Sequence, residues 1–107
     1  MHAEKLKGHL ELLLLAAIDG GPSHGYAIAE TLRRRSDGAF DLPDGTIYPA
    51  LRRLEKSGLV ASRWSDATAR RRRVYRLTTA GRRALAAEQH DWSRFARAVM
   101  SVVKGVA

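Results

Sequence analysis

The stretch from Gly45 to Gly58 constrains the fold most, because its apolar and basic residues separate onto opposite faces of a helix. At about 100° per residue, one face carries the apolar residues Ile47, Ala50, Leu51 and Leu54. The opposite face carries Pro49, Arg52, Arg53 and Lys56. One side should therefore pack against a core, while the other presents cations to a partner.

Pro49 and Gly58 give the expected limits of this helix. A proline does least harm in the first turn, where its missing N–H has no intrahelical acceptor. We therefore expect Gly45 or Thr46 to be the N-cap. Gly58 should end the helix, since glycine readily takes the left-handed conformation of a C-terminal cap.

Two alternating segments follow and predict a β-hairpin. Residues 59–65 alternate, and residues 73–77 place Tyr75 and Leu77 on one side of the second strand. The tip, residues 66–72, ends in three arginines and contains no Gly or Pro, so its turn type cannot be assigned. A helix that can read DNA, beside a hairpin with a basic tip, is the pattern of a winged helix.

Two helices are expected before this unit. Apolar residues recur at helical spacing from Leu6 to Ile18, and the Gly-Gly-Pro sequence at 20–22 should end that helix. Ser23 is the expected N-cap of a second helix that reaches about Arg35, with Tyr26 on its core-facing side. Between residues 36 and 44, Phe40 and Leu42 flank Asp41. This pattern predicts a brief strand that adds to the hairpin.

A last helix of about 26 residues is expected from Thr78 or Thr79 to Lys104. A heptad-like apolar seam runs along it: Leu85, Trp92, Phe95, Val99, Val102 and Val106. A helix about 40 Å long cannot bury its far half against a core of about 80 residues, so it should pack on a second copy of the chain. The prediction is a mainly α, α+β protein: residues 1–78 form a winged helix-turn-helix DNA-binding domain, and residues 79–107 a dimerisation helix.

The charge of the chain points to a polyanionic partner. Its 107 residues include 19 Lys and Arg against 11 Asp and Glu, a formal net charge of +8. Double-stranded DNA is the leading partner, and the alternative is a winged helix that binds an acidic protein. The chain has no cysteine, its four histidines show no ligand spacing, and no catalytic motif occurs, so we expect neither a metal or cofactor site nor an enzyme.

The apolar run from Leu12 to Ile18 is too short to span a bilayer, which takes about 20 residues. Lys5 and Lys7 precede this run, so a signal peptide is an alternative, but Glu4 and Glu11 crowd it. We therefore expect a cytoplasmic protein without a membrane partner.

The candidate DNA contacts follow from the basic helix face and the hairpin tip. For the helix they are Thr46, Tyr48, Pro49, Arg52, Arg53 and Lys56, of which the first three lie near its N-terminus and within reach of base edges or phosphates. For the hairpin they are Arg70, Arg71, Arg72 and Arg73, which suit the phosphate backbone or the minor groove. Each set could instead be a solvated surface, but their placement around one hairpin favours DNA.

The sequence resembles the PadR family of winged-helix transcriptional regulators over nearly its whole length. The likeness rests on Gly25-Tyr26, residues 45–51 (GTIYPAL), Arg53-Leu54-Glu55, Gly58-Leu59-Val60, Trp64, residues 75–78 (YRLT) and Gly81. It is greatest to the short members that have a single C-terminal helix. The departures are Val74, where an aromatic or basic residue is frequent, and a hairpin tip without the usual Gly or Pro.

The resemblance implies a homodimeric repressor that binds an inverted repeat near its own or a neighbouring gene and releases it when a small molecule binds. Some short members bind flat aromatic molecules at the dimer interface through an aromatic residue of the last helix. Trp92 and Phe95 are the matching candidates for effector binding. The alternative is that Trp92 only fills the dimer seam.

Overall fold

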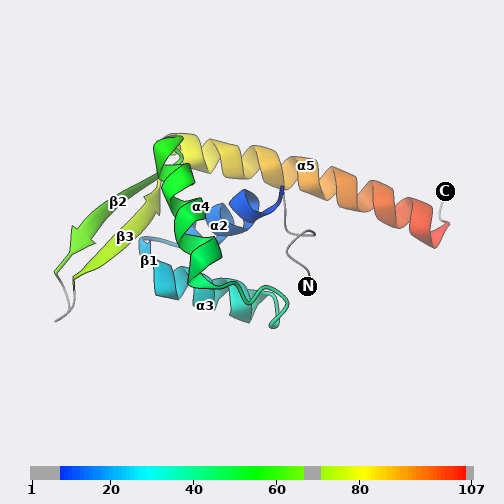
Figure 1. The fold of residues 1–107 in the computed structure, drawn as a ribbon. Coiled ribbons are helices and arrows are strands. Elements are labelled where there is room, and N and C mark those ends of the chain that lie inside the picture. Colours follow the sequence, from blue (N-terminus) through cyan, green and yellow to red (C-terminus); the bar gives the residue numbers. More distant parts are fainter. Residues whose placement is uncertain (1–7, 67–70, 106–107) are drawn as a thin grey trace.

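The computed structural model describes residues 8–66 and 71–105 of the chain. These residues form four helices and a three-stranded antiparallel sheet: α2 (Leu10–Ile18), β1 (Ser23–His24), α3 (Gly25–Arg35), α4 (Asp44–Lys56), β2 (Val60–Ser65), β3 (Arg72–Leu77) and α5 (Thr79–Lys104). In Figure 1, α2, α3 and α4 gather around the start of α5. The hairpin of β2 and β3 points away on one side, and the far part of α5 projects on the other. The helix-rich α+β winged helix is confirmed.

The core lies where α2, α3 and α4 meet the sheet and the first turns of α5. Its fully buried large side chains are Leu14, Leu15, Ile18, Ile28, Ile47, Leu51, Leu54 and Val60. Each such side chain contributes about 1.5–3 kcal/mol when it is removed from water. All four predicted apolar positions of α4 are buried here, so the periodicity of that helix identified its core-facing side.

The first helix of the described residues, α2, begins at Leu10, whereas Leu6, where the predicted helix starts, lies outside the described residues. Gly8 has a φ of 92°, a left-handed value that a right-handed helix does not contain. His9 is the N-cap residue, and its carbonyl accepts the backbone N–H of Leu13 (3.1 Å). The predicted helix from Leu6 to Ile18 was therefore too long at its N-terminal end.

The strand that adds to the β2–β3 hairpin is β1, and the order of strands in the sheet is β1-β3-β2. Ser23 pairs with Tyr75 and His24 with Val74, whereas residues 40–42 form no strand. The predicted strand at Phe40–Leu42 was wrong because the end of α3 curls back on itself. There the N–H of Gly38 donates to the carbonyl of Arg33 (2.8 Å), and the N–H of Phe40 donates to Ser36 Oγ (2.9 Å).

The second predicted helix is α3, but its N-cap is His24 and not Ser23. The backbone N–H of Ala27 donates to His24 Nδ1 (3.3 Å), while Ser23 belongs to β1. Tyr26, predicted in the core, is 69% exposed, because Gly25, Ile28 and Leu32 form the buried side of the helix. The Tyr26 ring stacks instead beside the His24 ring (centroids 6.4 Å apart).

Helix α4 begins at Asp44, with Pro43 as N-cap, so Pro49 lies inside the helix and not in its first turn. The predicted cap at Gly45 or Thr46 was wrong, because the Pro43 carbonyl already accepts the N–H groups of Thr46 (2.9 Å) and Ile47 (3.1 Å). Pro49 therefore cannot supply the N–H that the carbonyl of Gly45 would receive in a regular helix. The C-terminal end matches the prediction, with Gly58 at a φ of 80°.

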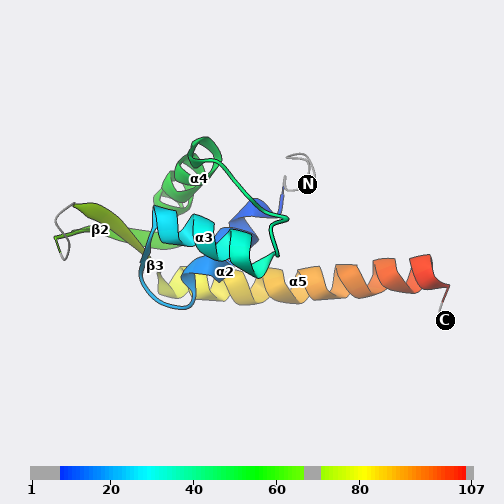
Figure 2. The same ribbon diagram turned by 90° about the horizontal axis from the view of Figure 1, so that it is seen from below.

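Helix α5 begins after Thr78, whose Oγ1 accepts the N–H of Gly81 (3.0 Å) and donates to the carbonyl of Gly58 (2.7 Å). Leu85 is buried in the core, Trp92 still contacts His9 beside α2, and the far part of the helix projects from the body of the protein (Figure 2). Gly105 caps its end at a φ of 66°. No helix in the described part of the chain combines the length and the apolar character that crossing a bilayer requires.

Candidate nucleic-acid interface

Helix α4 presents its predicted cations to solvent. Arg52, Arg53 and Lys56 are exposed, whereas Thr46, Tyr48 and Pro49 are half-buried. The cations and the buried leucines lie on opposite sides of one helix because both follow its 3.6-residue period. This geometry leaves a free, basic helix face of the kind that enters a major groove.

Tyr48 has a packing role besides any contact with DNA. Its ring lies so close to the Cα of Gly25 that a Cβ there would come within 2.5 Å of the ring. Gly25 thus allows α3 and α4 to approach each other. The sequence pattern identified Gly25 and Tyr48 separately, but only the folded chain shows that these two residues are in contact.

The wing is defined here as β2, β3 and the residues that join them. On it, the guanidinium groups of Arg71 and Arg73 lie 4.9 and 5.2 Å from the centre of the Trp64 ring. Such cation–π contacts hold exposed arginines close to one ring. Arg71 also pairs with Asp66 (3.3 Å). Arg70, the first predicted wing contact, lies outside the described residues.

Arg73 contacts α4 as well as Trp64. Its Nε donates to Ser62 Oγ (2.8 Å), Ser62 Oγ donates to Glu55 Oε2 (2.6 Å), and Arg73 Nη2 lies 3.7 Å from that carboxylate oxygen. These contacts join the wing to the helix that carries Arg52 and Arg53. Sequence reasoning missed Glu55 and Ser62, although the pairing of Ser62 with Tyr75 puts Ser62 and Arg73 on one face of the sheet.

Arg72 reaches toward β1, the strand on the other side of β3 from β2. Its Nη1 lies 3.0 Å from Nε2 of His24, a residue of β1. The two residues border an open groove of about 500 Å³ between the start of α3, α4 and the wing, lined also by Tyr26, Tyr48, Arg52 and Trp64. We refer to it as the α3–wing groove. His24 and Tyr26 were not among the predicted DNA contacts.

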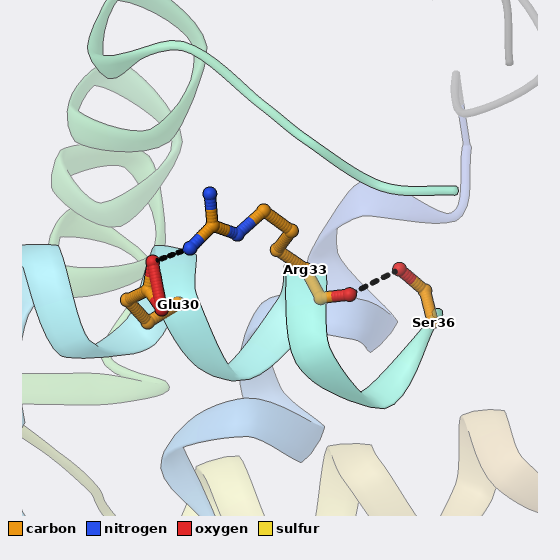
Figure 3. A network of polar contacts seen from close by, with 3 residues as sticks. All are labelled: Glu30, Arg33 and Ser36. Atoms are coloured by element: carbon orange, nitrogen blue, oxygen red, sulfur yellow. Dashed lines mark hydrogen bonds and ion pairs between the residues drawn. The ribbon is translucent and has the colours of Figure 1, made fainter. Parts of the chain in front are cut away.

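The second run of arginines, at the end of α3, lies away from this groove. Figure 3 shows Arg33 turned toward Glu30 of the same helix, and Ser36 Oγ donates to the Arg33 carbonyl (3.3 Å). The Arg35 guanidinium donates to the carbonyl of Ala16 (3.4 Å). The start of α3 adjoins β1, and its end lies on the opposite side of the body (Figure 1), so this run is not part of the α4–wing face.

The residues predicted for effector binding lie on α5 beside α2. Trp92 meets the His9 ring edge-on (centroids 4.9 Å apart) and contacts the Phe95 ring (5.9 Å). They border an open hollow of about 320 Å³ with Leu12, Glu88 and Asp91. Burial raises the pKa of the Glu88 carboxyl, Glu11 and Asp91 raise it further, and His9 opposes the shift.

The predicted dimerisation residues divide into two groups. Leu85 is 4% exposed and belongs to the chain's own core. Trp92, Phe95, Val99 and Val102 are exposed, and Val102 reaches 81%. The exposed apolar stripe of α5 therefore starts at Trp92 and not at Leu85. Val106 lies outside the described residues.

Among the described residues, no group of three or more His, Cys, Asp or Glu side chains is arranged to hold a metal ion.

Comparison with known proteins agrees with this geometry. The transcriptional regulator Rv3488 of Mycobacterium tuberculosis is 39% identical over 77 residues, which cover 72% of this chain and 69% of that protein. A PadR family regulator from Eggerthella lenta has a similar structure (TM-score 0.79, 32% identity, 94% of this chain and 86% of that one). So does a transcriptional regulator from Clostridium thermocellum (TM-score 0.82, 26% identity, 92% and 94%).

The family model described as "Transcriptional regulator PadR-like family" matches residues 14–87. This match runs from the core leucines of α2 through α4 and the wing to the start of α5. It covers α3, α4 and the wing, the elements that carry the basic surface. The chain therefore belongs to the PadR-like family of transcriptional regulators, which are DNA-binding proteins and not enzymes.

Proposed function

We propose that the protein is a homodimeric repressor of its own or neighbouring genes, which binds a pseudo-palindromic operator and is released by a small-molecule effector. The observation that carries this proposal is the exposed basic face of α4 next to the arginine-rich wing. Regulation of transcription follows from the family; the dimer, the direction of control and the effector are the proposed parts.

In this proposal α4 lies in the major groove. Arg52, Arg53 and Lys56 are free to reach base edges or phosphates, because the apolar side of the helix is occupied by the core. Thr46, Tyr48 and Pro49 lie on the first half of the helix, and their half-buried side chains leave only part of each surface for DNA.

The wing supplies contacts to the DNA backbone. Arg71 and Arg72 are exposed, while Arg73 is half-buried and engaged with Glu55 and Ser62. We therefore assign Arg71 and Arg72 to phosphate contact and Arg73 chiefly to holding the wing against α4. Arg70 completes the predicted basic tip of the wing.

Dimerisation through α5 would place a second α4 on the same face of the DNA. The apolar stripe of Trp92, Phe95, Val99 and Val102 is left exposed in the single chain, and a helix that projects from the body buries such a stripe by pairing with another copy. Two-fold symmetry then puts the two reading helices about 34–36 Å apart, one turn of DNA. The division at residue 78 into a DNA-binding domain and a dimerisation helix stays a prediction.

The hollow beside Trp92 is the proposed effector site. It lies where the exposed stripe begins and where α2 meets α5, so a flat aromatic molecule that stacked on Trp92 or Phe95 would alter both contacts. A change in the angle between two α5 helices would change the separation of the two α4 helices. That coupling would release the operator.

Fluorescence anisotropy with labelled duplexes from the region upstream of the gene tests the proposal. We expect tight, salt-dependent binding to one pseudo-palindrome and binding at least about a thousandfold weaker to a scrambled duplex. Arg52→Ala or Arg53→Ala should cost about 1–3 kcal/mol of operator binding if that side chain reads a base, with little change on the scrambled duplex.

Equal affinity for the two duplexes would reject sequence-specific repression. It would favour the other interpretation of the basic surface, a docking site for an acidic protein. A reporter gene placed behind the operator gives the direction of control, since a repressor lowers expression and an activator raises it.

A further inference from the structure

His24 lies between two hydrogen-bond donors. Its Nδ1 faces the backbone N–H of Ala27 at 3.3 Å, and its Nε2 faces the Arg72 guanidinium at 3.0 Å. A backbone N–H and a guanidinium only donate hydrogen bonds. Both ring nitrogens of His24 would have to accept for each of these contacts to be a hydrogen bond.

No protonation state of an imidazole that occurs in proteins meets this demand. Neutral histidine has one acceptor nitrogen and one N–H, and the imidazolium has two N–H groups and no acceptor. The Ala27 contact is the N-cap of α3, and it uses Nδ1 as the acceptor. In the tautomer that caps α3, Nε2 carries the hydrogen, and the contact between His24 and Arg72 then brings two donors together without an acceptor.

Charge pairing distinguishes Arg72 from the two arginines that flank it in the sequence. Arg71 is paired with Asp66 and Arg73 with Glu55. Within the described ranges, no carboxylate lies within ion-pair distance of Arg72. A guanidinium and an imidazole N–H that converge without an acid between them form a site that is complementary to an oxyanion.

The position of the pair in the sheet explains why the two side chains meet. His24 is opposite Val74 in the β1–β3 ladder, and Arg72 lies two residues before Val74 on the same strand face. Such diagonal neighbours lie about 7–8 Å apart at the backbone, which a long side chain spans. Both border the α3–wing groove, together with the exposed ring of Tyr26 and the cation of Arg52.

We propose that His24 Nε2 and the Arg72 guanidinium together hold one phosphate of the DNA backbone. The proposal rests on the DNA-binding function proposed above and adds a contact from the start of α3, outside α4 and the wing tip. The phosphate oxygen supplies the acceptor that both donors lack. Because a phosphate contact carries no sequence information, the pair fixes how the winged helix sits on the duplex, while α4 reads the bases.

Two variants test the pair. His24→Asn keeps an N-cap side chain that can accept the Ala27 N–H, but it is too short to reach the phosphate. Arg72→Gln removes the charge. Each should weaken binding to operator and scrambled duplex by the same factor, about tenfold for one hydrogen bond to a charged group.

The dependence of affinity on salt separates the two variants. Arg72→Gln should lower the slope of log K against log salt by about 0.9, whereas His24→Asn, which removes no charge, should leave the slope unchanged. Arg34→Gln is the matched control: it removes one exposed arginine at the far end of α3 and should change neither slope nor affinity. Thermal unfolding followed by circular dichroism checks that all three variants fold.

Methylphosphonate substitution, which neutralises one phosphate at a time, locates the contact. In each half-site, one position should weaken wild-type binding and have no further effect on Arg72→Gln, and less effect on His24→Asn than on the wild type. Wild-type affinity for DNA in His24→Asn, or the absence of any such position, would overturn the proposal.

A titration with inorganic phosphate, followed by NMR of the His24 side chain, separates DNA from a small anion as the ligand. We expect weak binding that is not saturated at millimolar phosphate. Saturation below that range, with DNA affinity unchanged in both variants, would assign the site to a small anion and overturn the DNA contact. If the wild type binds operator and scrambled duplex equally, the repressor proposal fails, but the variants still test the phosphate contact on either duplex.

Discussion

At the scale of single residues, Gly81 sets how closely α5 approaches the start of the hairpin. A Cβ at this position would overlap the carbonyl oxygen of Leu59, which is backbone and cannot turn aside. The N–H of Thr78 also donates to that carbonyl (3.1 Å). The N-cap of α5 and the residue before β2 therefore pack closely against each other, and Gly81 allows this approach.

Gly81→Ala should lower the free energy of unfolding by about 3 kcal/mol or more, because the helix must shift away from Leu59. Gly45→Ala is the matched control, since nothing lies within 4 Å of a Cβ there. That substitution should leave stability unchanged or raise it by up to about 1 kcal/mol, because alanine favours helix over glycine. Urea denaturation measures both, and equal effects of the two substitutions would contradict the packing described.

Several residue predictions failed for local reasons. Tyr26 reads as a core tyrosine at helical spacing, but α3 begins only one residue earlier, so its ring lies at the edge of the protein. Pro49 reads as a first-turn proline, but the helix begins five residues before it. In both cases the spacing was correct, and the error lay in where the helix starts. That start depends on β1 and Pro43, which carry no strong sequence signal.

At the scale of elements, two contacts decide how the parts of the site are held. The Glu55–Ser62–Arg73 contacts join α4 to the wing, so the reading helix and the hairpin form one surface. The second contact, between α2 and α5, brings Glu88 near Glu11, while Asp91 follows Glu88 by three residues on α5 itself. Burial raises the pKa of Glu88, and those two carboxylates raise it further.

Replacement of Glu88 should remove a loss in the free energy of unfolding that the wild type undergoes as pH rises. Because its pKa is higher in the folded than in the unfolded chain, the folded state binds more protons between the two values, and stability falls as pH rises through that window. Glu88→Gln should therefore be more stable than the wild type at neutral pH. The difference should vanish as the pH falls below the range in which carboxyl groups titrate.

Thermal unfolding between about pH 4 and pH 7 measures this difference, since carboxyl groups titrate near the lower end of that range. Asp41→Asn, which likewise removes one carboxylate but at an exposed position outside α5, serves as a control for the effect of net charge. A Glu88→Gln variant that is less stable than the wild type at neutral pH would mean that the charged carboxylate has a favourable partner.

At the scale of the whole molecule, α5 has two roles that meet at Leu85 and Trp92. Its first turns belong to the core, the following turns lie beside α2, and its far part projects beyond the body (Figure 2). The exposed stripe that begins at Trp92 is the surface proposed for a second copy. The heptad spacing of the sequence does not distinguish the two roles, because Leu85 and Trp92 occupy equivalent positions of the seam.

Trp92→Ala combined with Val99→Asp should convert the proposed dimer to monomers, because the aspartate would place an unpaired charge in the seam. Light scattering measures the mass. Ala86→Asp is the matched control, since it adds the same charge to an exposed position of α5 outside the stripe. That variant should remain dimeric.

Leu85→Ala should behave differently from both. It should cost about 2–5 kcal/mol of stability, as for any large-to-small change in a core, without producing a folded monomer. A dimer that persists in the Trp92→Ala, Val99→Asp variant would mean that the chains pair through another surface.

The sequence by itself determined the elements whose residues are close together in the chain. The helical period of α4 separated Ile47, Leu51 and Leu54 from Arg52 and Arg53, and alternation in β3 placed Tyr75 and Leu77 on one side. The length of α5 was predicted almost to the residue. Period and capping are local properties, so they can be read without knowledge of the fold.

Only the tertiary structure decided which distant residues meet. His24 and Arg72 are 48 positions apart, and their contact depends on the short β1 strand, which no pattern predicted. The contact of Tyr48 with Gly25 and the burial of Leu85 likewise depend on how the helices pack. The basic face of α4 can thus be predicted from the sequence. The pair formed by His24 and Arg72 beside it exists only because β1, β3 and the start of α3 pack together.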